Sequence, residues 1–533
     1  MQQFIEKYAD QILGSLSGFD RLVFRGSLRR LNIGYWDTKR RVQVAKGMEE
    51  YLWQNKIQFK DYARHVKRVS ERLKEAALQP FRQQGLPVIF LRSTATDKDA
   101  LARAIAAERS VRQGLVCAIS SLEPSPTFEH CGINIIRRER PCHVLCHYQI
   151  HPQVGWCYAR VQTWFPFNIQ IGINGREWLA RQMDQAGLAY RQQGNCFVWV
   201  EDYAQTQQLL DAQLKTNWAE LLDGFGQQLH PTREQVFEHY PTDYYWTTFQ
   251  SEWATDITFR KGEDLKRLMS LLVPHATLTY ASADVLRFFG QRVNQSGAIP
   301  ARFHREVKTD LREYREGERV KYTLGGNSVK FYDKAYSESG QVLRAAETTI
   351  NRVAGLREYR AAEGGPAEDL QWRPLRKGVA GLYRRAEISQ HTNQRLLDAL
   401  ASVDDSRTVE ELTAAIQTAT RWNGRRVRGL RPWGEDQDLL AAINRGDFLI
   451  TGLRNRDLQK LLYTTEPASP IERRRRSAAV SRKLRMLRSH GLIQKVPRTH
   501  RYQVQGSARP ILAAILTTAR TSVHQLNQLG KAA

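Results

Sequence analysis

The sequence predicts a multidomain α+β protein, with an N-terminal α/β region, a central antiparallel β-sheet with helices, and a largely helical C-terminal part. Its 533 residues are enough for roughly three or four domains. Strand and helix patterns alternate near the N-terminus, and a run of β-rich segments follows them. Aromatic residues make up 10% of the chain, which argues against a mainly disordered protein.

The first predicted domain, residues 1–125, has strand patterns at 19–28, 88–91 and 115–120, with helical patterns at 42–54 and 99–108. Asp20 lies on the first of these strands, beside Arg21 and Arg25. The adjacent arginines favour a salt-bridge role for Asp20. The alternative is the leading carboxylate of a metal-dependent nuclease of ribonuclease-H type.

The second predicted domain, residues 126–215, begins with a meander of antiparallel strands at 133–138, 142–150, 155–165 and 167–173. We expect turns at 138–141, at 151–155 and at the Phe-Pro-Phe step that ends at Phe167. Asn174 and Gly175 open a helix, and a short strand at 196–200 and a helix at 202–214 follow. The aromatic residues Trp164, Phe165 and Phe167 are expected in the core rather than stacked on bases.

The segment 130–157 contains four cysteines and four histidines, residue types that can bind zinc. Its spacing differs from that of CxxC zinc motifs. On a strand, Cys142 and Cys146 face one side, whereas His143, His147 and His151 face the other. We therefore expect buried small residues and surface histidines here rather than structural zinc. Six cysteines in a chain of this length do not suggest a disulfide framework.

The third predicted domain, residues 216–362, is a helical core with a β-hairpin. In the segment 251–260, Glu252 and Asp256 are four residues apart, which places them on one face of an expected helix. Two such carboxylates can bind Mg²⁺ with a third from elsewhere. A surface salt-bridge network with Arg260 is the alternative.

The predicted hairpin pairs a strand at 329–332 with a strand at 342–350. Pairing would bring Tyr332, Asp333, Lys334 and Glu347 within about one side-chain reach. Such a group can bind a metal and act on a phosphodiester, or it can be a hydrogen-bonded hairpin end.

The hairpin, with its K-FYDK strand and following R-x-x-E strand, resembles a segment of rolling-circle replication initiators of plasmids and filamentous phages. The resemblance covers about 30 residues and implies that Tyr332 is a nucleophile, Glu347 a metal ligand and Lys334 a phosphate-charge neutraliser. Tyr336 adds the Tyr-x-x-x-Tyr spacing of initiators that use two tyrosines. Initiators usually carry a His-hydrophobic-His pair, whereas here three residues separate His147 from His151. The predicted metal is Mg²⁺ or Mn²⁺, with these candidate ligands: Asp333, Glu347, Glu252 and Asp256.

The net charge of +25 indicates a polyanionic partner, most commonly nucleic acid. The alternative is a basic but otherwise ordinary enzyme. Much of the excess is arginine near the C-terminus, where guanidinium groups suit phosphates and guanine edges. Residues 363–434 are predicted to form a helical linker region that ends in an Arg-rich arm. The arm's candidate nucleic-acid contacts are Arg425, Arg426, Arg428 and Arg431.

The last predicted domain, residues 435–533, shows helix, turn, helix, a long basic helix and a β-ribbon. This order, with the LRxLRxHGLIxK pattern at 484–495, resembles the winged helix-turn-helix family over about 80 residues. The resemblance implies that the long helix enters the major groove and that the wing contacts the backbone or minor groove nearby. A winged helix that binds protein is the alternative. The candidate DNA contacts here are Arg473, Arg474, Arg475, Arg476, Ser477, Ser481, Arg482, Arg485, Arg488, Lys495, Arg498, His500 and Arg501.

Together these patterns predict a nucleic-acid-binding protein of a mobile element or replication system. It would recognise DNA through the winged helix and nick or cleave it with a metal-assisted Tyr/Glu site. The alternative is a non-catalytic DNA- or RNA-binding protein, such as a component of a ribonucleoprotein with structured RNA. No membrane partner is expected, since no run of about 18 apolar residues occurs. A cytoplasmic location is the default, and the sequence does not define an oligomeric state.

Overall fold

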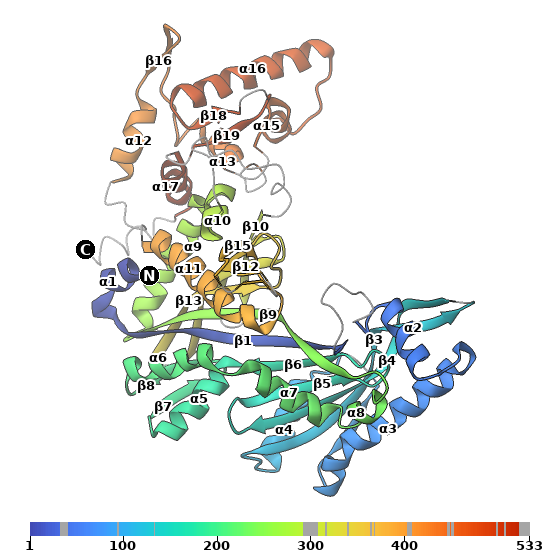
Figure 1. Cartoon of the computed structure of the whole chain (residues 1–533). Helices are drawn as coiled ribbons and strands as arrows, with labels where there is room; N and C mark the ends of the chain where they lie inside the picture. Colours follow the sequence, from blue (N-terminus) through green and yellow to red (C-terminus); the bar gives the residue numbers. More distant parts are fainter. Residues whose placement is uncertain are drawn as a thin grey trace. The chain divides into compact units, whose positions relative to one another are not determined.

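The computed structural model divides into two compact units, each built from separate stretches of chain. Unit 1 comprises residues 1–13, 258–346 and 391–533, and unit 2 comprises residues 14–257 and 347–390 (Figure 1). The structure describes the whole chain except the following residues: 32–40, 93–94, 133, 292–306, 315–316, 338–339, 363–364, 367, 402–407, 445–447, 449–451, 497–498, 506–507 and 522–533.

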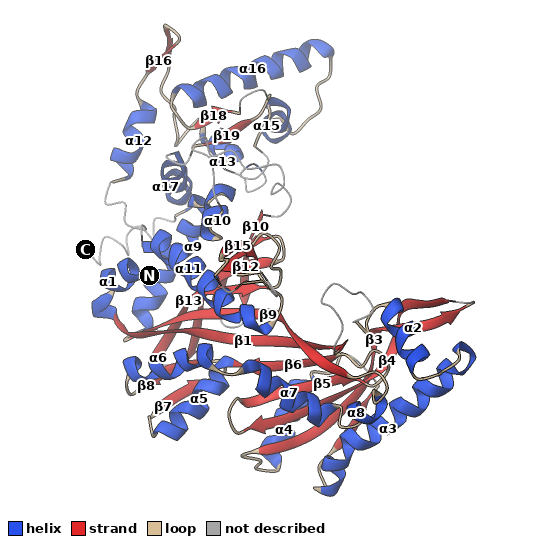
Figure 2. Ribbon diagram, viewed as in Figure 1, coloured by secondary structure: helices blue, strands red, loops and turns tan. Residues whose placement is uncertain are grey.

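Unit 2 is a mixed α/β unit (Figure 2). Its first part contains β1 (Ile12–Arg30), α2 (Ala45–Gln54), α3 (Tyr62–Gln83), β2 (Val88–Leu91), α4 (Lys98–Glu108), β3 (Gly114–Cys131), β4 (Asn134–His151), β5 (Gly155–Gln162), β6 (Ile169–Asn174), α5 (Gly175–Ala186), β7 (Tyr190–Gln193), β8 (Cys196–Val200), α6 (Tyr203–Asp211), α7 (Trp218–Leu229), α8 (Arg233–Val236) and β9 (Thr242–Phe259). Its second part contains the end of β13 (Gly340–Ile350), β14 (Arg357–Arg360), β15 (Gln371–Pro374) and the start of α11 (Leu382–Ala401).

The large sheet of unit 2 has the strand order β13-β9-β1-β6-β5-β4-β3-β2. β2 pairs with β3 in parallel, and the pairs β3–β4, β4–β5, β5–β6 and β1–β6 are antiparallel. The sheet is therefore mixed. The strands that follow one another in the meander are neighbours, whereas β1 and β9 reach their places from distant parts of the sequence.

Helices cover this sheet because each strand buries alternate side chains. One large core joins strand residues such as Phe24 and Ile171 to α3 through Leu73 and to α7 through Leu222. A second cluster packs Ile105 of α4 against the strands β3, β4 and β5. The helix α5 begins where predicted, since the side chain of its N-cap Asn174 accepts hydrogen bonds from two backbone amides of the first turn.

Unit 1 contains a second set of strands and most of the C-terminal helices. Its elements are α1 (Gln2–Lys7), α9 (Gly262–Thr279), α10 (Ser282–Phe288), β10 (Val307–Tyr314), β11 (Gly317–Leu324), β12 (Asn327–Ser337), the start of β13, the end of α11, α12 (Val409–Gln417), β16 (Thr420–Trp422), β17 (Arg425–Val427), α13 (Gln437–Ile443), α15 (Asn455–Leu462), α16 (Pro470–Ser489), β18 (Ile493–Lys495), β19 (Tyr502–Val504) and α17 (Arg509–Arg520).

Within unit 1 the strands follow the order β10-β11-β12-β13, so the predicted hairpin is formed by β12 and β13. Tyr322 of β11 packs against Tyr280 and Phe288 beside α10. The C-terminal helices share a separate core, which includes Leu440 of α13 and Leu484 of α16. The ribbon β18–β19 follows α16 directly and closes this core with Val504.

The mixed α/β composition and most predicted elements are confirmed, but two local predictions are wrong. Residues 138–141 form no turn, because β4 runs through them in a continuous ladder with β3. Pro141 fits there because β5 begins to pair with β4 only at Val144, so no neighbouring strand needs the missing N–H of the proline. Residues 251–260 form no helix, since 251–259 belong to strand β9. Their aromatic and β-branched residues suit a strand, and Trp253, Ile257 and Phe259 are buried.

In the part of the chain that the structure describes, none of the helices combines the length and apolar character needed to cross a membrane.

Candidate metal centre

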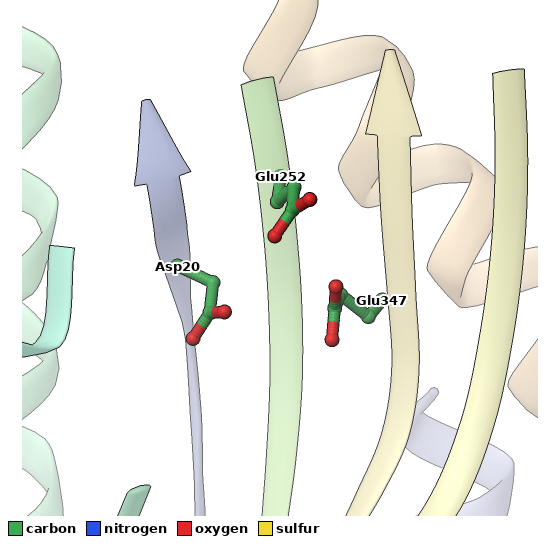
Figure 3. Close-up of side chains that lie close together, drawn as sticks. All are labelled: Asp20, Glu252 and Glu347. Atoms are coloured by element: carbon green, nitrogen blue, oxygen red, sulfur yellow. The ribbon is translucent and has the colours of Figure 1, made fainter. Parts of the chain in front are cut away.

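Three carboxylates of unit 2 converge on one point. They are Asp20 of β1, Glu252 of β9 and Glu347 of β13, and one carboxylate oxygen of each lies within 4.8 Å of the other two. Figure 3 shows the three side chains pointing toward one another from three strands. Among the described residues this is the one group of three or more Asp, Glu, His or Cys side chains close enough to share an ion.

The strand order explains why these distant residues meet. β13, β9 and β1 lie side by side in the sheet, so one carboxylate from each forms a row across the strands. Asp20 is 4% exposed and Glu347 is 1% exposed, whereas Glu252 is partly exposed. Three ionised carboxylates at this separation would repel one another strongly away from water. A bound cation would offset this repulsion, since buried charges are normally paired or coordinate metals.

The helix α5 delivers a buried arginine beside this group. The Nε atom of Arg176 lies 3.6 Å from Oδ1 of Asp20, and its Nη2 donates to Oδ2 of Asp256 at 2.8 Å. Gly175 permits this approach, because a Cβ at that position would lie 1.9 Å from the carbonyl oxygen of Phe19. Arg176 therefore shares its charge between two carboxylates and holds α5 against β1.

A second polar contact orients Asp20. The amide of Asn195, at the start of the β8 hairpin, donates from Nδ2 to Oδ1 of Asp20 at 2.8 Å. Asn195 in turn accepts a hydrogen bond from Asn174, the N-cap of α5, at 2.7 Å. Such outer contacts hold a ligating carboxylate in one orientation and tune its affinity for a cation.

Two of the three carboxylates, Asp20 and Glu252, line a pocket of about 700 Å³. The other charged side chains that line it are Arg21, Asp97, Lys98, Asp99 and Arg103. Lys98 forms an ion pair with Glu123, and Arg103 forms one with Asp99 at 2.8 Å, so both are held by fixed partners. The pocket thus combines the oxygen ligands of Asp20 and Glu252 with charged side chains of both signs.

Oxygen donors of this kind suit Mg²⁺ or Mn²⁺, which are typically bound by a few carboxylates while other positions remain for water and phosphate oxygens. The residues present therefore fit a hard divalent cation. Thiolate and imidazole ligands, which zinc prefers, do not belong to the group.

No protein-family model, curated protein or solved structure matches this chain. What the centre can do therefore follows from its own geometry.

Of the four predicted metal ligands, the structure brings Glu252 and Glu347 together and adds Asp20 to them. Asp256 does not join them, because its carboxylate forms the ion pair with Arg176. Asp333 is outside the group and belongs to unit 1. Burial raises the pKa of Asp333 to about 6, and Lys266 partly opposes the shift. Its Oδ1 accepts no hydrogen bond from the residues that the structure describes.

The remaining predicted catalytic residues lie on β12 of unit 1. Cations surround the ring of Tyr332: Nζ of Lys330 is 5.4 Å from its centroid, Nζ of Lys334 is 5.7 Å away, and the guanidinium carbon of Arg344 is 6.0 Å away. Lys334 is buried. The side chain of Tyr336 lies outside the described residues.

The segment considered for zinc forms β4 and its flanks. Cys142, Cys146 and Cys157 are buried, as expected for small residues. His147 is also fully buried, against the expectation of a surface position, and its ring packs edge-on against Phe81 of α3 at 4.6 Å. Burial lowers its pKa to about 3, so it is neutral at physiological pH.

Some of the predicted nucleic-acid contacts near the C-terminus form interactions within the protein. Ser477 and Ser481 contact Asn455 of α15, whose Nδ2 donates to the Ser477 carbonyl and the Ser481 hydroxyl, both at 2.9 Å, so they join two helices. Arg428 forms ion pairs with Asp436 and Glu435. Arg476 pairs with Glu472 and stacks on Tyr463.

Arg488 stacks on Trp422, and Arg501 is partly exposed. Arg498 lies outside the described residues. The exposed members of the predicted set are Arg425, Arg426, Arg428, Arg431, Arg473, Arg474, Arg475, Ser481, Arg482, Arg485, Lys495 and His500.

Four residues of the site were not predicted: Arg176, Asn195, Lys98 and Arg103. Lys98 and Arg103 belong to a helix, α4, that the sequence did predict, but nothing in its pattern ties it to Asp20. Asn174 and Gly175 were recognised as a helix start, which was the available signal that Arg176 begins a helix. The sequence contains no signal that this arginine is buried.

Proposed function

We propose that this chain binds nucleic acid and cleaves its phosphodiester bonds with a divalent cation held by Asp20, Glu252 and Glu347. The convergence of these three carboxylates, two of which line a pocket shared with Arg21, Lys98 and Arg103, is the observation that carries the proposal. The net charge of +25 supports a polyanionic substrate.

Bound Mg²⁺ or Mn²⁺ would polarise a phosphoryl oxygen and activate water as the nucleophile. The protein's own groups would have separate roles. Asp20, Glu252 and Glu347 would supply negative oxygen ligands, with Asn195 and Arg176 holding Asp20 in place. Lys98 and Arg103 would attract the phosphate and offset its charge.

For recognition, we propose that the domain predicted at residues 435–533 acts as a winged helix-turn-helix. Supporting this are the order α13, α15, α16, β18 and β19 and the exposed arginines of α16. Replacing Arg474, Arg475 and Arg482 by Gln in the full chain should weaken binding to duplex DNA and lower its salt dependence. Unchanged binding would show that the winged helix does not recognise duplex DNA. The resemblance to replication initiators supports a role in a mobile element or replication system.

The cleavage proposal is tested with end-labelled single-stranded and duplex DNA in the presence of Mn²⁺, Mg²⁺ or EDTA. We expect product with Mn²⁺ or Mg²⁺, none with EDTA, and none from the Asp20→Asn variant. Calorimetric titration with Mn²⁺ should give binding to the wild-type protein and much weaker binding to Asp20→Asn. Binding of DNA without any product under all conditions would favour the non-catalytic alternative.

A tyrosine mechanism is a second candidate, favoured by the three cations around Tyr332. A tyrosine that attacks phosphorus stays covalently attached to the DNA end. A protein–DNA adduct that is retained on denaturing gels and lost in Tyr332→Phe would establish this route. Product without an adduct would assign cleavage to water at the carboxylates.

A further inference from the structure

An uncovered row of arginines lies on one side of β1 in unit 2. Arg21, Arg25 and Arg29 are four residues apart, and an even spacing places them on the same side of a strand. The residues between them confirm this, because Leu22, Phe24 and Leu28 are buried in the large core on the opposite side. Arg21 and Arg25 are exposed, and Arg29 is partly exposed.

Aromatic rings of the adjacent strand β9 support two of these arginines. The guanidinium carbon of Arg25 lies 3.4 Å from the ring centroid of Phe249, and that of Arg29 lies 3.2 Å from the centroid of Tyr245. Phe249 is 41% exposed, which is unusual for a large apolar side chain on a central strand. The row therefore combines planar guanidinium groups with exposed aromatic rings. Proteins bind single-stranded nucleic acid with this combination.

The row ends in a strongly basic pocket of about 490 Å³. Ser27, Arg29, Tyr245 and Thr247 form its floor on β1 and β9. The other cations that line it are Arg41, Arg137, Arg360, Arg376 and Lys377. Among the residues described there, no acidic side chain lines this pocket, although Glu358 behind it pairs with Arg360 and Arg376.

Two arginines of the row, Arg21 and Arg25, have no acidic partner among the described residues. Burial and the nearby charge of Arg160 lower the pKa of Arg25. Arg25 is held instead by Gln170, whose Oε1 accepts from its Nε at 3.4 Å. An anion along the row would offset this repulsion.

Alternation places Asp20 on the side of β1 opposite to the row, but the pocket lined by Asp20, Arg21 and Glu252 joins the row to the candidate metal centre. Arg21 lines the same pocket as Asp20 and Glu252, and Arg29 lines the basic pocket at the other end. Arg29 lies nine residue steps along β1 from Asp20, a distance of about 30 Å at 3.3 Å per residue. A strand of nucleic acid several nucleotides long would span this distance.

We propose that Arg21, Arg25 and Arg29, with Phe249 and Tyr245, form a track for single-stranded nucleic acid that runs from the basic pocket to the carboxylates. The track deepens the proposed function, since it rests on nucleic acid being the substrate and specifies the strand that reaches the metal. Phosphates contact the arginines and the basic pocket, and a base stacks on Phe249. Duplex would enter this site only after strand separation.

The test is binding of a fluorescein-labelled oligothymidylate, followed by anisotropy in EDTA so that no cleavage occurs. The track variant carries Arg25→Gln, Arg29→Gln and Lys377→Gln in the full chain. The matched control carries Arg64→Gln, Lys67→Gln and Arg68→Gln on the exposed face of α3. It loses the same number of positive charges as the track variant. A third variant, Arg25→Lys with Arg29→Lys, keeps the charge and removes the planar guanidinium groups.

We expect the track variant to bind at least tenfold more weakly, and the slope of log K against log salt to fall by about 2, at about 0.7 per lost phosphate contact. The control variant should bind like the wild-type protein. The lysine variant should keep the wild-type slope and bind with intermediate affinity. Equal losses in the track and control variants, or wild-type binding by the track variant, would overturn the track.

Failure of the track and failure of the proposed function give different results. If the wild-type protein cleaves with Mn²⁺ but the track variant binds like wild type, the track is wrong and the metal centre stands. If the track variant alone loses binding and no condition gives product, the track stands and cleavage is wrong. Circular dichroism and thermal melting of each variant exclude unfolding as the cause.

Discussion

Two regions of this molecule carry a buried carboxylate, and they handle its charge in different ways. In unit 2, carboxylate oxygens of Asp20, Glu252 and Glu347 lie within 4.8 Å of one another, with Arg176 beside Asp20, and Asp20 and Glu252 line a pocket. In unit 1, Asp333 is 8% exposed and stands outside any such group, and its pKa is raised to about 6 by burial.

The difference shows that burial alone does not make a metal site. A single buried carboxyl group can reduce its cost by taking up a proton, which is what the raised pKa of Asp333 expresses. Three converging carboxylates require much more compensation, and a divalent cation supplies it with two charges at once. Convergence is therefore the feature to look for, rather than burial.

The sharpest way to break this comparison is to neutralise one carboxylate in each region. Glu347→Gln should lower metal-dependent cleavage about 100-fold or more, at or beyond the upper end of the 10–100-fold typical of residues that only orient a ligand. Asp333→Asn should leave the rate within a small factor of the wild-type rate. Single-turnover cleavage of labelled DNA with saturating Mn²⁺ measures both. Equal losses in the two variants would show that the regions do not differ in this respect.

The second prediction concerns the pH dependence of stability. Because the folded-state pKa of Asp333 lies near 6 and its ordinary value is 3.8, the folded protein holds this proton more tightly than the unfolded chain does. The contribution of this group to the free energy of unfolding is therefore fully present below about pH 4. It is lost as the pH rises through about 6, and the loss amounts to at most roughly 3 kcal/mol.

Asp333→Asn should thus raise the melting temperature at pH 7.5, and the gain should shrink as the pH is lowered toward 4. Differential scanning fluorimetry across this range measures it. A gain that is independent of pH would show that the carboxyl group does not titrate in this way.

The third and smallest effect is stabilisation by metal. A hundredfold excess of Mn²⁺ over its dissociation constant should stabilise the folded protein by about 2.7 kcal/mol, or roughly 5–10 °C in melting temperature for a unit of a few hundred residues. The increase should disappear in Asp20→Asn and persist in Asp333→Asn. An equal increase in all three proteins would point to binding elsewhere.

Much of the fold was predictable because its signals are local. Residues 88–91 and 196–200 are apolar runs of strand length, and they form β2 and β8. The helix α12 lies in the region predicted to be helical, and its first turn carries a local signal, the capping box of Thr408 with Glu411. β9 was missed because its i, i+4 acids suggested a helix, although its aromatic and β-branched residues were a signal for a strand.

The candidate site was only half predictable because its geometry depends on strand order. Glu252 and Glu347 were named, each for a local reason that differs from the one the structure supplies. Asp20 was assigned a salt bridge with an adjacent arginine, whereas the arginine that approaches it is Arg176, at 3.6 Å. Residues 20, 252 and 347 meet only because β1, β9 and β13 are neighbours, and no local pattern encodes that order.

The return of the chain to unit 2 at Glu347 has a consequence for biosynthesis. The ribosome makes residues 14–257 first, then the whole excursion 258–346, and only then the last carboxylate. Domains generally fold as the nascent chain emerges from the ribosome. Until β13 has been synthesised, β9 therefore lacks this neighbouring strand. A nascent or truncated chain that stops before residue 347 lacks one of the three carboxylates, so the candidate metal centre is incomplete until about two-thirds of the chain has been synthesised.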